Sequence, residues 1–100
     1  MEIDQIINQV ADLNAKIEVF RARILEHDRK LKAYRQEIQQ LRSQTGGGRK
    51  DRKAQIRRLK FFANQAKKAR KSERIRVEVY TQNVQELVAD FDTFFREASE

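Results

Sequence analysis

The stretch TGGGRKDRK, at residues 45–53, contains the only three glycines of the 100-residue chain. A regular pattern of apolar residues precedes it, and a strongly basic segment follows it. Glycine commonly ends α-helices, and Asp is a favourable N-cap residue. We therefore predict a turn at 45–51, with Asp51 capping the helix that follows. The two flanking helices are expected to cover about 2–44 and about 52–98.

The first helix is predicted from apolar residues that recur at spacings of three and four through six heptads. This pattern is typical of a coiled-coil helix that packs against a partner along its whole length. Only His27 interrupts the pattern. The residues of this first seam are Ile3, Ile6, Val10, Leu13, Ile17, Phe20, Ile24, His27, Leu31, Tyr34, Ile38 and Leu41.

The second helix carries a similar seam, which is strong at both ends and weak in the middle. A strand over 74–81 is the competing interpretation, because apolar and polar residues also alternate there. No second strand is available to pair with it, so the helix is favoured. The residues of this second seam are Ile56, Leu59, Ala63, Ala66, Arg70, Glu73, Val77, Tyr80, Val84, Leu87, Phe91, Phe94 and Ala98.

The two seams match in an antiparallel register in which the numbers of paired residues sum to 97. The sequence therefore predicts an all-α fold, a two-helix antiparallel coiled-coil hairpin that forms a single domain over 1–100. A polar layer of His27, Arg70 and Glu73 is expected to fix the register. The predicted pairs include Leu41 with Ile56, Tyr34 with Ala63, Leu31 with Ala66, His27 with Arg70, Phe20 with Val77, Ile17 with Tyr80, Ile6 with Phe91, and Ile3 with Phe94.

Apolar residues beside the seam at the open end of this hairpin predict a second interface. A homodimer that forms a four-helix bundle there is the simplest arrangement, and a monomer is the alternative. The interface residues would be Ile7, Val88, Phe91, Phe94 and Phe95. A GGG run is also typical of an engineered linker between two arms of a larger coiled coil, and this alternative stays open.

Composition narrows the class of protein. The chain has no Cys, so neither a disulfide framework nor a thiolate metal site is available. The acidic segment MEIDQIINQV does not resemble a signal peptide, and no apolar run approaches the ~20 residues of a membrane span. We therefore expect a cytoplasmic protein. A single His and no phosphate-loop motif give little support to an enzyme, a metal site or a cofactor.

Positive charge is concentrated around the turn. Residues 29–71 contain sixteen Lys and Arg against two acids, whereas the other residues contain six against thirteen. Six cations of the second helix form a stripe at helical spacing, and Arg35 and Arg42 of the first helix flank the same seam. Such like charges destabilise a hairpin, which favours an external polyanion over a merely solvated face. The stripe consists of Lys53, Arg57, Lys60, Lys67, Lys71 and Arg74.

Nucleic acid is the commonest polyanion, and its phosphates reward clustered cations through counterion release. Phe61 could stack on an unpaired base, although packing of Phe61 or Phe62 beside the seam is the more ordinary role. No base-reading motif is present, so weak sequence preference is expected and RNA is not distinguished from DNA. The candidate binding residues are Arg49, Lys50, Arg52, Lys53, Arg57, Arg58, Lys60, Phe61, Lys67, Lys68, Lys71 and Arg74.

A different functional class fits the same pattern. A structural coiled-coil adaptor, or a fragment of a larger coiled-coil arm, could place this basic half against an acidic protein surface. Binding to a membrane surface ranks third, because pairing of the seams leaves no broad apolar face on the basic helix. Salt-dependent binding to generic RNA or DNA would separate the first two interpretations.

Overall fold

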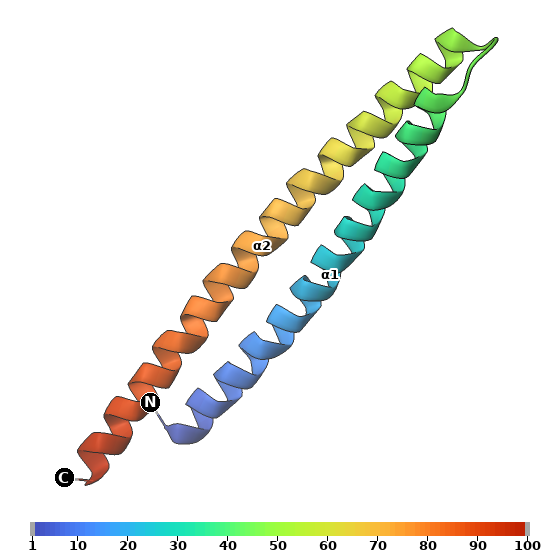
Figure 1. Ribbon diagram of the computed structural model, residues 1–100. Helices are drawn as coiled ribbons and strands as arrows, with labels where there is room; N and C mark the ends of the chain where they lie inside the picture. Colours follow the sequence, from blue (N-terminus) through green and yellow to red (C-terminus); the bar gives the residue numbers. More distant parts are fainter. Residues whose placement is uncertain (1, 100) are drawn as a thin grey trace. The chain divides into compact units, whose positions relative to one another are not determined.

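The computed structural model describes residues 2–99, which form two long helices and no strand (Figure 1). Helix α1 covers Ile3–Ser43, and helix α2 covers Arg49–Ser99. The predicted all-α class is therefore confirmed, and the strand alternative at 74–81 is wrong because α2 continues through it. No helix in this part of the chain is both long and apolar enough to cross a membrane.

The chain divides into two compact units, and each contains a segment of both helices. The turn unit is Arg23–Ser72 and includes the connection between α1 and α2. The terminal unit combines the residues up to Ala22 with those from Glu73 onwards.

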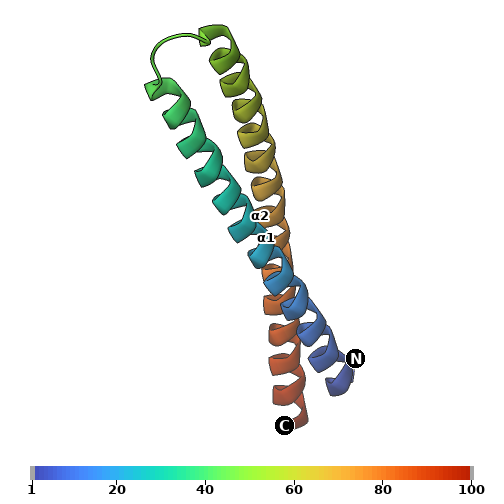
Figure 2. The same cartoon turned by 90° about the vertical axis from the view of Figure 1, so that its right-hand side faces the viewer.

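The connection between the helices is shorter than predicted and lies earlier in the sequence (Figure 2). Residues 44–48 link the helices, because the Gly48 carbonyl already accepts the first α2 hydrogen bond, from the Arg52 backbone N–H at 3.0 Å. Gly48 is thus the residue that precedes the helix. The prediction of Asp51 as the N-cap was wrong, since Asp51 lies within the first turn of α2. Its carboxylate there still suits the positive end of the helix dipole.

Glycine is required at two of the three turn positions. Gly46 and Gly48 adopt φ angles of +101° and +84°, which residues with a Cβ rarely adopt. The guanidinium group of Arg52 donates hydrogen bonds to the carbonyl oxygens of Gly46 and Gly47. Backbone conformation and this side chain together define the path of the turn.

The core of the turn unit places large residues of α1 against small residues of α2. Leu31 is only 1% exposed and packs with Ala63 and Ala66, and Tyr34 lies against this cluster. The predicted matching of Leu31 and Tyr34 with the two alanines agrees with this core. Small residues let neighbouring helices approach closely, so the seam remains well packed although it contains few large apolar side chains.

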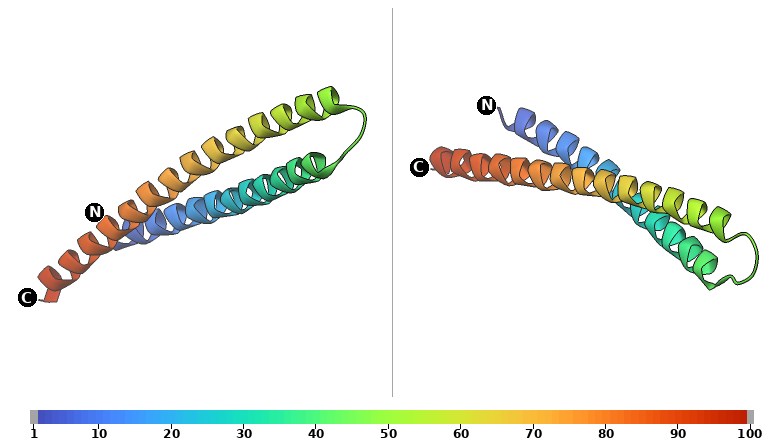
Figure 3. Two further views of the ribbon diagram at one scale, coloured as in Figure 1. Left: turned by 45° about the horizontal axis from the view of Figure 1, so that its top comes forward. Right: turned by 90° about the horizontal axis from the view of Figure 1, so that it is seen from above.

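Helices α1 and α2 run antiparallel within the turn unit (Figure 3), and two cross-helix contacts there support the predicted register. The rings of Tyr34 and Phe62 stack with centroids 6.1 Å apart, and Arg70 Nη1 donates to Asp28 Oδ1 at 2.8 Å. The residue numbers of these pairs sum to 96 and 98, on either side of the predicted 97. Arg70 therefore bonds to Asp28, the residue next to His27. The predicted polar layer around His27 did not include Asp28.

The core of the terminal unit is built around Ile6, Ile17 and Phe20, which are all buried. Phe20 stacks on Tyr80 with ring centroids 5.7 Å apart. In the predicted register, Val77 lies opposite Phe20 and Tyr80 lies opposite Ile17. The long Tyr80 side chain therefore reaches from its own layer to the adjacent layer of Phe20. Lys16 Nζ lies 5.8 Å from the Tyr80 ring centroid, and the Arg76 guanidinium lies 5.3 Å from that of Phe20.

The burial pattern follows the predicted seams closely. Every residue of the first seam is buried or half-buried, and Asp28 is the only other residue of α1 that is not exposed. The second seam is likewise protected from Ile56 to Phe91. Its last two positions differ from the prediction, because Phe94 and Ala98 are exposed.

Replacing Gly46 or Gly48 with Ala should lower the free energy of unfolding by about 1 kcal/mol, because a Cβ is disfavoured at positive φ. For a chain of this size that loss lowers the midpoint of thermal unfolding by roughly 4–8 °C. Gly47→Ala is the control, since Gly47 has no positive φ and a Cβ would meet no atom within 4 Å. Circular dichroism melting curves measure the difference, and equal destabilisation by all three variants would contradict it.

Asp28→Asn should destabilise the turn unit by about 1 kcal/mol. A hydrogen bond between charged groups contributes roughly 1.5–3 kcal/mol, but these side chains are 24% and 41% exposed, so solvent weakens it. Glu26→Gln is the control, because Glu26 pairs with Arg29 at 3.8 Å on the surface and should change stability by less than ~0.5 kcal/mol. Urea unfolding of both variants tests this, and equal losses would show that the cross-helix bond is unimportant.

Candidate nucleic-acid interface

The two units have opposite net charges. The turn unit contains seventeen Lys and Arg against four Asp and Glu, a net charge of +13. The terminal unit contains five Lys and Arg against eleven Asp and Glu, a net charge of −6. Together they give the chain's +7. Any site for a polyanion is therefore expected in the turn unit, where few carboxylates compete for the cations.

The stripe on α2 is exposed to solvent. Five of its six predicted cations belong to the turn unit and are exposed: Lys53, Arg57, Lys60, Lys67 and Lys71. Arg74 is also exposed but belongs to the terminal unit. Arg58 and Lys68 of α2, which directly follow the stripe residues Arg57 and Lys67 in the sequence, are exposed as well. The turn unit therefore presents a surface of accessible cations.

Cations of α1 lie around the same groove as a cation of the stripe. Arg35 and Arg42 of α1 and Lys60 of α2 line one hollow together with Ile38 and Gln39. The expectation that Arg35 and Arg42 lie near the basic side of α2 is thus supported, although we did not include them among the candidate binding residues. Both arginines can be recognised in the sequence, because they lie seven residues apart on either side of Ile38, and this spacing places both of them beside the seam.

The three cations predicted at the turn have different surroundings. Arg49 and Lys50 are exposed in the first turn of α2. Arg52 is half-buried, because its guanidinium group bonds to the turn carbonyls described above. Its structural role in the turn was not visible in the sequence, where Arg52 is one member of a basic run.

Phe61 and Phe62 form a small aromatic cluster with Tyr34. Phe61 packs edge-on against Phe62 with ring centroids 5.9 Å apart, and Phe62 stacks on Tyr34. Packing beside the seam, the ordinary role considered for these residues, is therefore present. Phe61 nevertheless remains 58% exposed, and Arg57 and Arg58 precede it by one helical turn. Its exposed surface is available for stacking on a base.

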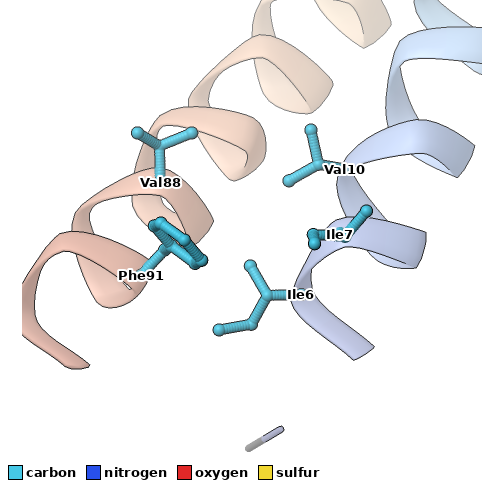
Figure 4. A pocket seen from close by; sticks show the side chains of 5 residues that line it. All are labelled: Ile6, Ile7, Val10, Val88 and Phe91. Atoms are coloured by element: carbon cyan, nitrogen blue, oxygen red, sulfur yellow. The ribbon is translucent and has the colours of Figure 1, made fainter. Parts of the chain in front are cut away.

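A separate apolar groove lies in the terminal unit (Figure 4). Ile6, Ile7 and Val10 of α1 face Val88 and Phe91 of α2 across it. Ile7 is 54% exposed and Val88 is 45% exposed. The structure thus brings together three of the five residues predicted at a dimer interface.

The other two predicted interface residues lie nearby on α2. Phe95 stacks on Phe91 with ring centroids 6.0 Å apart and is 59% exposed. Phe94 is 41% exposed. Four of the five predicted interface residues are therefore exposed to solvent, and Phe91 is half-buried.

Within residues 2–99, no cluster of three or more His, Cys, Asp and Glu side chains could hold a metal ion. His27 is half-buried in the seam of the turn unit.

Comparisons with known proteins found no similarity on which a family assignment could rest. No protein-family model, no curated protein and no solved structure matches the chain.

Proposed function

We propose that this protein is a small cytoplasmic accessory protein that binds the phosphate backbone of nucleic acid through the basic surface of the turn unit. The observation that carries this proposal is the row of exposed cations that α2 presents in the turn unit, Lys53, Arg57, Lys60, Lys67 and Lys71, with further cations of α1 across the seam from Lys60. Like charges held close together on two paired helices destabilise the pairing. A polyanion removes that repulsion and gains free energy from counterion release.

Weak sequence preference follows from the chemistry of the surface. Lys and Arg contacts to phosphates position a nucleic acid but do not read its bases. Phe61 adds a sequence-tolerant contact, because every base offers a face on which an aromatic ring can stack. RNA and DNA share both features, so the proposal covers both.

The expected signature is a steep fall in affinity for nonspecific duplex DNA as salt rises. The surface should make roughly four to seven phosphate contacts, and at ~0.9 per contact the log–log slope should be about −4 to −6. Changing Arg57, Lys60 and Lys67 to Gln should flatten the slope by about two to three. Fluorescence anisotropy over a salt series measures both values.

The control for this experiment changes Lys16, Arg21 and Arg23 to Gln, which removes the same charge outside the stripe. This control should leave the slope almost unchanged. Circular dichroism spectra of both variants establish that the helices remain intact. If the parent binds no nucleic acid at low salt, an acidic protein surface becomes the better partner for the basic half, as expected for a coiled-coil adaptor.

We also propose that the terminal unit associates with a second copy to form a four-helix bundle. The support is the apolar groove together with the exposed rings of Phe94 and Phe95. Aromatic side chains contribute strongly to interfaces, and facing helix pairs commonly share such a surface in four-helix bundles. A symmetric dimer would bury this patch on both copies at once.

Val88→Glu should shift the protein from dimer to monomer, because the new carboxylate would be buried without a partner in the interface. Val79→Glu is the matched control, since Val79 is also about half exposed (49%) on α2 in the terminal unit but lies outside the groove. Sedimentation equilibrium over a concentration series gives the mass of each variant. A monomeric parent, or a dimer that Val88→Glu leaves intact, would contradict the proposed interface.

A further inference from the structure

The hollow at Ile38 is lined by cations of both helices, and the register extends this arrangement along the turn unit. Arg35 and Arg42 of α1 lie seven residues apart, a distance of about 10.5 Å along the helix axis. Lys60 of α2 lines the same hollow from the other helix. Lys53 and Lys67 lie seven residues before and after Lys60, so they continue its side of α2.

The register shows how these cations alternate along the groove. Because paired numbers sum to about 97, Lys60 lies opposite position 37, between Arg35 and Arg42. Lys53 and Lys67 then fall opposite positions 44 and 30, beyond the two arginines. Cations from α1 and α2 therefore interleave, with five of them over roughly 21 Å of groove.

The cationic row of α1 ends at a carboxylate. The next residue of the row, seven before Arg35, is Asp28, whose carboxylate accepts a hydrogen bond from Arg70. The opposite end of the row is Arg42, at the last turn of α1. The two-sided groove is thus confined to the segment between Asp28 and the turn.

This arrangement suits a single strand of phosphodiester backbone. Helices in contact have axes about 8–10 Å apart, so the groove between them admits one strand and not a whole duplex. A guanidinium group can donate two parallel N–H bonds to a phosphate, and Lys supplies a compact positive charge. Gln39, which also lines the hollow, offers an amide N–H₂ donor.

We propose that one phosphodiester strand lies in this groove and contacts cations of α1 and α2 at the same time. The proposal rests on the function proposed above and deepens it, because it assigns Arg35 and Arg42 to the site in addition to the α2 stripe. The strand can be a free single strand or one edge of a duplex, since both present the same phosphate chemistry.

The decisive variant is Arg35→Gln/Arg42→Gln, tested with a single-stranded oligothymidylate and with a mixed-sequence duplex of equal length. Loss of two phosphate contacts should flatten the salt slope by about 1.4 on the single strand or about 1.8 on the duplex. The oligonucleotide that shows the larger relative loss of affinity, single-stranded or duplex, is the one that the groove prefers. The matched control is Arg29→Gln/Lys30→Gln, which removes equal charge from α1 outside the row and should change the slope by less than half as much.

Stability without ligand distinguishes binding from a structural role. Removing Arg35 and Arg42 relieves like-charge repulsion, so the variant should unfold at the same or a higher temperature while binding more weakly. If the Gln variant loses helix, the variant Arg35→Lys/Arg42→Lys takes its place in the experiment, because it keeps the positive charge. Weaker binding at an unchanged slope then supports paired guanidinium contacts, and unchanged affinity overturns them.

The outcomes separate this inference from the proposed function. A parent that binds, with an Arg35/Arg42 variant that binds equally well, overturns the groove and leaves the α2 stripe as the site. Equal losses in the variant and in its Arg29/Lys30 control also overturn the groove, because net charge alone would then explain binding. A parent that binds neither oligonucleotide at low salt overturns the proposed function itself.

Discussion

The packing of Leu31 against Ala63 and Ala66 is the contact on which the turn unit depends. The small alanine side chains let α2 approach α1 closely, and Leu31 is almost completely removed from solvent there. Larger residues at the alanine positions would separate the helices and widen the groove beside Ile38. Close packing therefore both holds the register and brings the cations of the two helices around one hollow.

The same closeness has an electrostatic cost. The turn unit has a net charge of +13 after its four acids are counted, Asp28 with its cross-helix ion pair to Arg70 among them. Apolar burial and turn geometry must supply the remaining stability. Residues that serve a function often reduce stability in this way, and the cationic surface is consistent with such a compromise.

Much of the fold could be predicted because it depends on local periodicity. The apolar spacing located every protected position of the first seam and the cluster of Leu31 with the two alanines. Features set by individual side chains or backbone angles could not be predicted. Examples are the start of α2 at Arg49, which depends on positive φ at Gly46 and Gly48, and the bond of Arg70 to Asp28.

The candidate site divides in a similar way. Helical spacing predicted the exposed stripe on α2, because exposure follows from the position of the seam. It did not show that Arg52 bonds to the turn carbonyls or that Phe61 packs on Phe62, since these contacts depend on rotamers. Dimerisation and ligand choice involve a second molecule, so the periodicity of one chain cannot decide them, and they stay predictions.

The seven-residue repeat of the cations has a consequence for motion along a polymer. A strand bound there as proposed and displaced along the groove would again place phosphates near Lys53, Lys60 and Lys67, because phosphates recur along the backbone. The bound state would then be a series of overlapping positions separated by low barriers. If the proposed strand binds there, such a surface would allow one-dimensional diffusion along the backbone and would give the complex a translational entropy that a single fixed docking position lacks.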